Sequence, residues 1–176
     1  MQDSRHRSPT AIELHRFPGD GTIPNNAALA LIVYRGAFAS APDIAAACEA
    51  RFAANRWGDG WRNGIYDYHH YHSTAHEALG IAAGSASVRF GGEGGSTVVV
   101  RAGDVVVIPA GVGHKLVDGT PDLLVVGAYP DGQQPDLQTA DPGRHDASAR
   151  RIAAVPLPTA DPLHGPDGPL IRHWRD

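Results

Sequence analysis

The sequence predicts an all-β domain, a barrel or sandwich of short antiparallel strands, with one helix ahead of most of them. Between Gly64 and Tyr129 the chain is a series of short apolar runs separated by glycine, which is the pattern of many short strands joined by tight turns. No helical stretch long enough to connect parallel strands interrupts this region. The 176 residues, 42% hydrophobic and 19% charged, fit one globular domain with a real core.

The region before Gly64 holds the predicted helix. Residues 1–28 are polar and carry several prolines, so we expect an arm with little regular structure. Leu29 to Tyr34 is a short apolar run that predicts a strand. From Pro42 to Trp57 the apolar residues recur at helical spacing. A proline suits the first helical turn, and Gly58 follows as a stop.

The remaining elements are short strands and a proline-rich extension. Eight of the fourteen prolines lie in residues 130–176, so this part should run over the domain surface with one short helix near 144–153. The chain therefore divides into an arm (1–28), a barrel (29–130, with the helix at 42–57) and an extension packed on the barrel (131–176). The strands predicted after the helix are 64–72, 77–83, 86–90, 97–101, 104–108, 114–117 and 123–129.

Composition and charge exclude several kinds of partner. The net charge is −4 with ten histidines counted as neutral, and no basic cluster is present, so nucleic acid is not expected. The apolar runs are too short to span a bilayer, and the first residues lack the apolar core of a secretory signal. Cys48 is the only cysteine, and its place on the helical face predicts a buried, inert thiol. We expect a cytoplasmic protein without membrane contact.

A His-x-His pair is the main functional signal. His70 and His72 occupy alternate positions of a predicted strand, so they share a face about 7 Å apart and can converge on one metal ion. A turn after them can bring Glu77 back from the next strand as a further ligand. Tyr66 and Tyr68 have the same parity, which makes them candidate proton donors or substrate anchors. The competing interpretations are two solvated histidines and two packing tyrosines.

A second signal is the rigid turn that leads to His114. Gly103 fits a turn, and a strand of valines and isoleucine follows it. Pro109 ends that strand, and two glycines allow a tight reversal before His114 opens the next strand. Such a turn can aim one side chain at a site, although the same sequence also suits an ordinary hairpin that happens to begin with histidine.

Together these signals match two known motifs. The first motif, G-x5-H-x-H-x4-E-x6-G, is filled at Gly64, His70, His72, Glu77 and Gly84. The second motif, G-x5-P-x-G-x2-H, is filled at Gly103, Pro109, Gly111 and His114. The sequence therefore resembles the cupin superfamily, and over nearly its whole length it is similar to small bacterial cupins of the YjlB type. The fuller second motif has Asn after three further residues, where this chain has Asp118, a position that is not a ligand.

The resemblance implies a jelly-roll barrel (a double-stranded β-helix, RmlC-like) with a metal inside. It also implies that His70, His72, Glu77 and His114 are the ligands. Three imidazoles and one carboxylate suit one divalent transition metal, Fe, Mn, Ni, Cu or Zn, and they leave two positions open for other ligands. His76 is the competing residue, because a bulge at 73–75 would turn it toward the site in place of Glu77.

The resemblance leaves the reaction open. We expect a metal-dependent oxidoreductase, dioxygenase-like, that acts on a small organic molecule. A non-catalytic metal or small-molecule binding protein (a sensor or storage cupin) and a metal-dependent isomerase are the alternatives, because one fold hosts many functions. A homodimer is the expected assembly.

Overall fold

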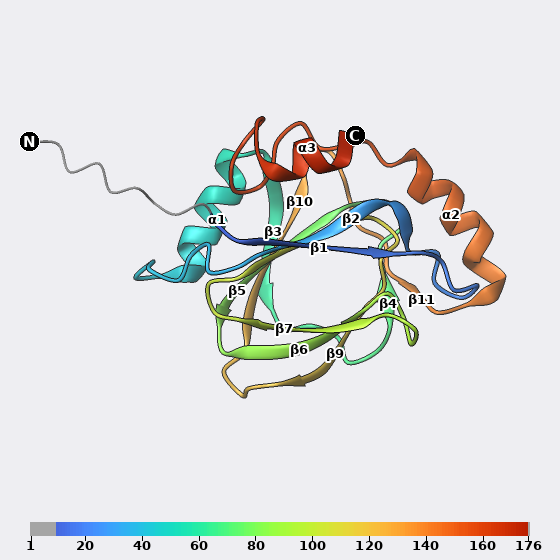
Figure 1. Ribbon diagram of the computed structural model, residues 1–176, viewed down its shortest axis with the longest axis horizontal. Helices are drawn as coiled ribbons and strands as arrows, with labels where there is room; N and C mark the ends of the chain where they lie inside the picture. Colours follow the sequence, from blue (N-terminus) through green and yellow to red (C-terminus); the bar gives the residue numbers. More distant parts are fainter. Residues whose placement is uncertain (1–9, 176) are drawn as a thin grey trace, which may run out of the picture.

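Two antiparallel sheets face each other in the computed structural model, which describes residues 10–175. The larger sheet has six strands in the order β1-β2-β8-β5-β10-β3, and the smaller has five in the order β11-β4-β9-β6-β7 (Figure 1). The strands are β1 (Ile12–Phe17), β2 (Asn26–Tyr34), β3 (Trp57–Asn63), β4 (His70–Tyr71), β5 (Glu77–Ala83), β6 (Ser85–Phe90), β7 (Ser96–Arg101), β8 (Val105–Ile108), β9 (His114–Gly119), β10 (Leu124–Pro130) and β11 (Gln138–Thr139). The helices are α1 (Ile44–Ala54), α2 (His145–Ala154) and α3 (Pro169–Arg175), with a 3-10 turn, η1, at Pro142–Arg144.

The inner core lies between the two sheets. Along β6 and β7 buried and more exposed residues alternate, so one face of this hairpin points inward and the other toward solvent. The inward residues meet those of the larger sheet in one apolar cluster, which includes Phe17, Leu31, Val33, Leu79, Ile81, Val88, Phe90, Val100, Val106, Ile108 and Val125. Two antiparallel sheets around such a core form a jelly roll, which confirms the all-β prediction.

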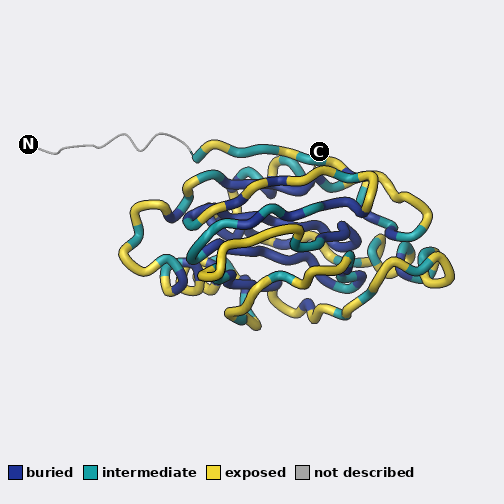
Figure 2. The backbone as a smooth tube through the Cα atoms, turned by 90° about the horizontal axis from the view of Figure 1, so that it is seen from below, coloured by how far each residue is buried: buried dark blue, intermediate teal, exposed yellow. Residues whose placement is uncertain are grey.

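A second core lies on the outer side of the larger sheet, under α1 and α3. Figure 1 shows both helices against this sheet, and Figure 2 shows the buried strands enclosed by exposed loops. Cys48, Phe52 and Trp174 are among the helical residues buried there. This double burial explains why β2 and β8 are apolar on both faces.

The predicted helix is shorter than expected. Asp43 is its N-cap and accepts a hydrogen bond from the Ala46 amide at 3.0 Å, so the helix begins one residue later. It ends before Arg56, whose φ of 67° leaves the helical region, and Trp57 already belongs to β3. The predicted range 42–57 was therefore wrong at both ends.

Helix α1 docks on β5 at Gly80. A Cβ atom at Gly80 would lie 2.5 Å from the Cys48 sulfur, so the helix approaches the strand as closely as it does only because that residue is glycine. Cys48 is fully buried, as predicted. Burial raises the pKa of its thiol to about 12, and the thiol is inert at neutral pH.

The prediction that residues 1–28 have little regular structure was wrong at 12–17 and at 26–28, whereas residues 18–25 form no strand or helix. Residues 12–17 form β1, which pairs with β2 and sets Ile12 opposite Tyr34 and Leu14 opposite Ile32. β1 is an edge strand, so much of it stays exposed to solvent, and even Leu14 is 43% exposed. Its sequence is therefore too polar to show the alternating apolar pattern from which a strand would be predicted. Residues 1–9 of the predicted arm lie outside the described range.

The strand predicted at 64–72 was also wrong over most of its length. Only His70 and Tyr71 are paired, and residues 64–69 form a loop. The preceding residues Trp57–Asn63 form β3 instead and pair with β10. Glycines at two positions, Gly58 and Gly60, gave this strand no regular apolar pattern, although its pairing with β10 supplies the backbone partners that it needs.

The C-terminal extension is fastened to the larger sheet through buried polar groups. Asp161 is fully buried and accepts hydrogen bonds from the Tyr34 hydroxyl at 2.5 Å and from the Leu170 amide at 3.0 Å. The indoles of Trp57 and Trp174 donate to main-chain carbonyls across the same contact, each at 2.9 Å. Helix α2 lies within one residue of the range predicted for it, whereas α3 was not predicted.

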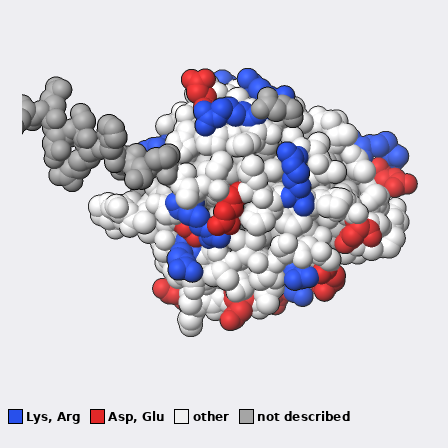
Figure 3. Space-filling model, viewed as in Figure 1, with Lys and Arg blue, Asp and Glu red and all other residues white. Residues whose placement is uncertain are grey.

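The surface is mixed in charge. On the face seen in Figure 3, Lys and Arg side chains are interspersed with Asp and Glu, and no basic cluster stands out. Within residues 10–175 no helix is both long and apolar enough to cross a membrane.

Candidate metal centre

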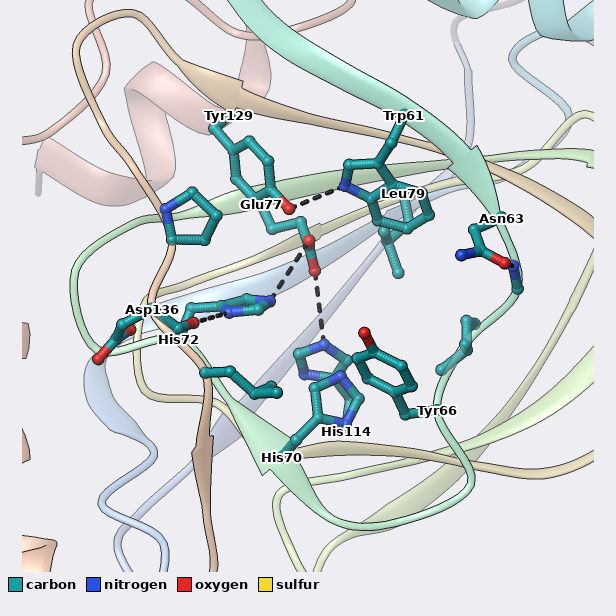
Figure 4. Close-up of a pocket in the computed structure, with 14 residues that line it drawn as sticks. Trp61, Asn63, Tyr66, His70, His72, Glu77, Leu79, His114, Tyr129 and Asp136 are labelled. Carbon is teal, nitrogen blue, oxygen red and sulfur yellow. Dashed lines mark hydrogen bonds and ion pairs between the residues drawn. The ribbon is translucent and has the colours of Figure 1, made fainter.

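Three histidines converge at one end of the inner core, between the two sheets (Figure 4). His70 on β4 pairs directly with His114 at the start of β9, and their rings lie 4.0 Å apart. His72 follows β4 on the same side. One nitrogen from each of the three rings lies within 4.8 Å of the others. The structure thus brings together the His-x-His pair and the histidine that the rigid turn aims.

The hydrogen bonds of these rings fix which nitrogen can bind a metal. Each ring has its Nδ1 against a main-chain carbonyl oxygen, at 2.9 Å for His70, 2.5 Å for His72 and 3.1 Å for His114. A carbonyl oxygen only accepts, so Nδ1 carries the proton and Nε2 keeps its lone pair. The three accepting carbonyls belong to Tyr68, Asp136 and Val112, respectively.

Glu77 supplies an oxygen donor beside these nitrogens. It begins β5 and is buried, with its two carboxylate oxygens each 3.4 Å from an Nε2 atom, one of His72 and one of His114. Burial alone raises the pKa of this carboxyl, but the two histidines outweigh burial and hold the pKa well below its usual range. Glu77 is therefore ionised, as a ligand to a metal must be.

The electrostatics of the ring cluster favour a bound cation. Burial and the neighbouring His114 lower the pKa of His70 to about 3, so this ring is neutral at ordinary pH. Burial also lowers the pKa of His72, but Glu77 more than compensates and raises it. The three Nε2 atoms and the Glu77 carboxylate face each other in a buried site, where a metal cation could take the place of a proton between them. A divalent transition metal fits this donor set.

His76 lies outside the cluster. Its Nδ1 accepts a hydrogen bond from the Ala110 amide at 2.9 Å, and its ring packs 4.8 Å from the ring of Trp174. His76 immediately precedes β5, and its contact with Trp174 of the outer core places its ring on the side of the larger sheet away from Glu77. Burial lowers the pKa of His76 to about 4. The bulge that would have exchanged the two residues is not present.

A cavity of about 410 Å³ opens beside the four donors. Its walls combine aromatic and aliphatic side chains with polar ones, among them Asn63, Asp136 and two tyrosines, as small-molecule sites often do. Besides the four donors, the residues that line it are Trp61, Asn63, Gly64, Ile65, Tyr66, Leu79, Tyr129, Pro135, Asp136 and Leu137.

The two tyrosines predicted at the site differ in position. Tyr66 lines the cavity and packs edge-on against His70 at 5.1 Å. Tyr68 stacks on Tyr66 at 5.1 Å and is not part of the cavity wall. Both are substantially exposed, at 53% and 40%. They stay near His70 although the strand that was expected to align them is a loop.

Tyr129 is a residue of the site that the sequence did not predict. Its hydroxyl accepts a hydrogen bond from the Trp61 indole at 2.8 Å and faces Glu77 across the cavity (Figure 4). Burial and the Glu77 charge raise the pKa of this hydroxyl, so it keeps its proton. Its parity with Val125, which is buried in the inner core, was the available signal.

Asp136 was also missed, because the extension carried no motif. Its carboxylate accepts hydrogen bonds from the Ser73 amide at 2.6 Å, from the Ser73 hydroxyl, and from Thr74 at 3.2 Å. Burial raises the pKa of Asp136, but these hydrogen bonds outweigh it and lower the pKa overall. Arg151 on α2 donates to the same Ser73 hydroxyl at 2.8 Å, so the extension is tied to the turn between the two metal-site strands.

Comparisons with known proteins agree with this architecture. The model of the cupin domain family matches residues 63–125, which contain both histidine motifs. The uncharacterized protein YjlB of Bacillus subtilis (strain 168) is 40% identical over 158 residues, which are 90% of this chain and 93% of that protein.

Among solved structures the similarity is weaker. A DUF861 family protein from Thermotoga maritima is 23% identical, with a TM-score of 0.31, over 46% of this chain and 83% of that chain. The DMSP lyase DddQ from Ruegeria pomeroyi is 17% identical, with a TM-score of 0.35, over 80% of this chain and 56% of that chain. A Bacillus subtilis oxalate decarboxylase, OxdC, is 16% identical, with a TM-score of 0.36, over 66% of this chain and 29% of that chain.

The identity to YjlB extends over nearly the full length of both proteins, and the domain match falls on the strands that carry the three histidines and Glu77. The chain therefore belongs to the cupin family, in its YjlB-like group.

Proposed function

We propose that this cupin binds one divalent transition metal through His70, His72, Glu77 and His114, and that it acts on a small organic molecule as a dioxygenase-like oxidoreductase. The observation that carries the proposal is the common direction of the donors: three Nε2 atoms with fixed lone pairs and one ionised carboxylate face a single cavity. A redox-active metal held there would supply a Lewis acid and an exchangeable electron beside the substrate.

The chain's own residues define what else such a site can do. The Tyr66 and Tyr129 hydroxyls reach the cavity and can hold or pass a proton at a substrate oxygen. Tyr68, the other predicted proton donor, acts in this proposal by supporting the Tyr66 ring on which it stacks.

A non-catalytic role in metal or small-molecule binding is the second candidate, and one observation favours it. Apart from the four donors, the cavity wall contains a single ionisable acid, Asp136, and its carboxylate is committed to Ser73 and Thr74. A metal-dependent isomerase would need a mobile proton carrier, and only the tyrosines offer one.

Metal analysis of matched variants tests the site. We expect the purified protein to hold about one equivalent of transition metal and His70→Ala to lose most of it. His69→Ala is the control, because His69 is the adjacent histidine and contacts Glu93 on the outside. Unchanged metal content in His70→Ala would overturn the ligand assignment.

Oxygen uptake then separates the functions. Iron- or manganese-loaded protein is mixed with catechols, β-diketones and flavonoids, and consumption of O₂ that depends on both metal and substrate supports the oxidoreductase. Tight zinc with no turnover supports the binding role. Sedimentation or light scattering tests the expected homodimer, and a cytoplasmic location remains a prediction.

A further inference from the structure

Strand β1 ends the larger sheet, so one side of its backbone has no described strand beside it (Figure 1). Its other side pairs with β2, and just before β1 the Arg35 amide donates to the Ala11 carbonyl at 2.9 Å. In an antiparallel pair, residues that bond to the neighbouring strand alternate with residues that point away from it. Glu13 therefore bonds toward β2, whereas the amides and carbonyls of Ile12 and Leu14 point to the open side.

The other sheet edges are protected against pairing with a further strand. On β7 the carbonyl of Val99 already accepts a hydrogen bond from Arg35 at 2.7 Å. On β3 the φ of Asp59, 51°, and a register shift against β10 break the regularity of the edge. Strand β11 has two residues. Among the described strands, β1 is thus the end strand that offers an open edge, regular from Ile12 to His15.

We propose that β1 pairs with β1 of a second copy of this chain, in antiparallel direction about a two-fold axis at Leu14. An axis that joins two edge strands into one sheet runs perpendicular to the sheet, so each residue opposes a residue on the same face. With Leu14 opposite itself, the outward amides and carbonyls bond across the axis, and Ile12 faces Arg16 of the partner subunit. The two six-stranded sheets then form one continuous sheet.

The side chains of β1 fit this register. Leu14 lies on the outer face of the sheet, opposite Ile32 of β2, and is 43% exposed in the single chain. Leu14 of the partner subunit would cover it. On the inner face Glu13 would oppose His15 of the partner subunit, twice by symmetry, which is a favourable cross-strand pair. An axis at Arg16 would instead set two guanidinium groups against each other.

His15 lacks a hydrogen-bond partner within one chain. Its Nε2 atom is buried, and no described residue forms a hydrogen bond with it. The carboxylate of Glu13 is 3.5 Å away and accepts two hydrogen bonds from Arg35, at 2.8 and 3.1 Å. A carboxylate across the new strand pair would give the imidazole a partner, which removes the cost of an unpaired polar group. A groove of about 570 Å³ between β1 and β7, lined by both residues, leaves room for the side chains of the second copy.

Disulfide cross-linking tests the register. Opposed residues of a hydrogen-bonded antiparallel pair have Cα atoms about 5.5 Å apart, which is within the range of a disulfide. Leu14→Cys should therefore form a covalent dimer on mild oxidation, and the buried thiol of Cys48 does not interfere. Val99→Cys, at a similarly exposed position on β7, is the matched control and should stay monomeric on a denaturing gel. A dimer in solution that Leu14→Cys does not cross-link would overturn the inference.

Sedimentation velocity of charge variants tests the complementarity. His15→Glu sets like charges opposite each other twice and should weaken self-association by about tenfold, whereas His15→Lys should preserve it. Leu14→Lys places two charges on the open edge and should abolish the dimer. Because Leu14 is 43% exposed, this variant should still fold, which thermal unfolding checks. Equal dimer affinities in the two His15 variants would contradict the proposed register.

The interface deepens the homodimer expected under the proposed function, and it does not need a metal. Wild-type protein that stays monomeric at the highest concentrations measured overturns the inference and leaves the β1 edge to a strand of another protein. Its metal content still tests the four donors. A dimer that Leu14→Cys cross-links but that holds no metal supports the interface and overturns the metal assignment alone.

Discussion

His72 donates its Nδ1 proton to the main-chain carbonyl of Asp136 at 2.5 Å, so the C-terminal extension orients a side chain of the barrel. The other two rings of the cluster differ in this respect. His70 and His114 each donate to a carbonyl two residues earlier in their own segment. The orientation of His72 is therefore the only one of the three that depends on a distant part of the chain.

Removing the Asp136 side chain should loosen the metal site without touching a ligand. Asp136→Ala keeps the carbonyl but loses the anchors to Ser73 and Thr74. We expect metal affinity to fall by about 10- to 100-fold, the usual cost of disturbing a partner of a ligand. Competition titration with a zinc chelator measures it. Asp146→Ala is the control, since this aspartate is exposed on α2. Equal affinities in the two variants would show that the anchor is not needed.

Separate substitutions of the neighbours His76 and Glu77 distinguish a core histidine from a proposed metal ligand. His76→Ala should keep the metal but lower the free energy of unfolding by about 2–4 kcal/mol, because it leaves a void beside Trp174 and an unpaired Ala110 amide. Glu77→Gln should fold and lose most of the metal. Metal analysis and denaturant unfolding of both variants check this, and the reverse pattern would make His76 the ligand.

The contact between α1 and β5 should show strong coupling. Gly80→Ala pushes a methyl group against the Cys48 sulfur, 2.5 Å from the expected Cβ position, and should cost about 1–3 kcal/mol of stability. Cys48→Ala removes that sulfur, so the double variant should be more stable than the sum of the single effects indicates. Urea unfolding of the four proteins completes the cycle. Simple additivity would mean that the helix shifts away instead.

Cys48 also predicts a loss of stability at alkaline pH. Burial raises the pKa of its thiol from 9.0 to about 12, so above pH 9 the unfolded chain releases this proton before the folded protein does. The stabilisation is complete below pH 9 and is lost as the pH rises toward 12. Relative to Cys48→Ala, the wild type should lose up to about 1.4 kcal/mol per pH unit in that range. Urea titrations between pH 8 and 11 test this. Parallel curves for the two proteins would contradict it.

Elements with strong local sequence patterns could be predicted from the sequence. The strand at 77–83 is observed at the predicted residues, and the other barrel strands after it lie within two residues of prediction, because alternation and glycine turns are local signals. The three histidines were also found, since their spacing on a strand and after a rigid turn is local. Their convergence depends on the pairing of β4 with β9, a long-range contact that local spacing does not predict.

Elements that are stabilised by contacts with distant parts of the chain could not be predicted from the sequence. Strand β1 is polar on one face and obtains its pairing from β2, and α3 has seven residues, too few to show helical periodicity. Tyr129 and Asp136 reach the site from β10 and from the extension, and neither belongs to a motif. Their roles come from tertiary contacts with Trp61 and Ser73, which no local window contains.

The bond between His72 and the Asp136 carbonyl also sets an order of events during synthesis. A ribosome releases the barrel strands first, so a nascent chain that ends at Pro130 already has all four donor side chains but no acceptor for His72 Nδ1. In that state the ring can rotate or change tautomer, and the donor set is not yet fixed. The arrangement of the four proposed donors is therefore complete only after the extension has emerged and docked, so a metal at this site would be expected to bind late in maturation.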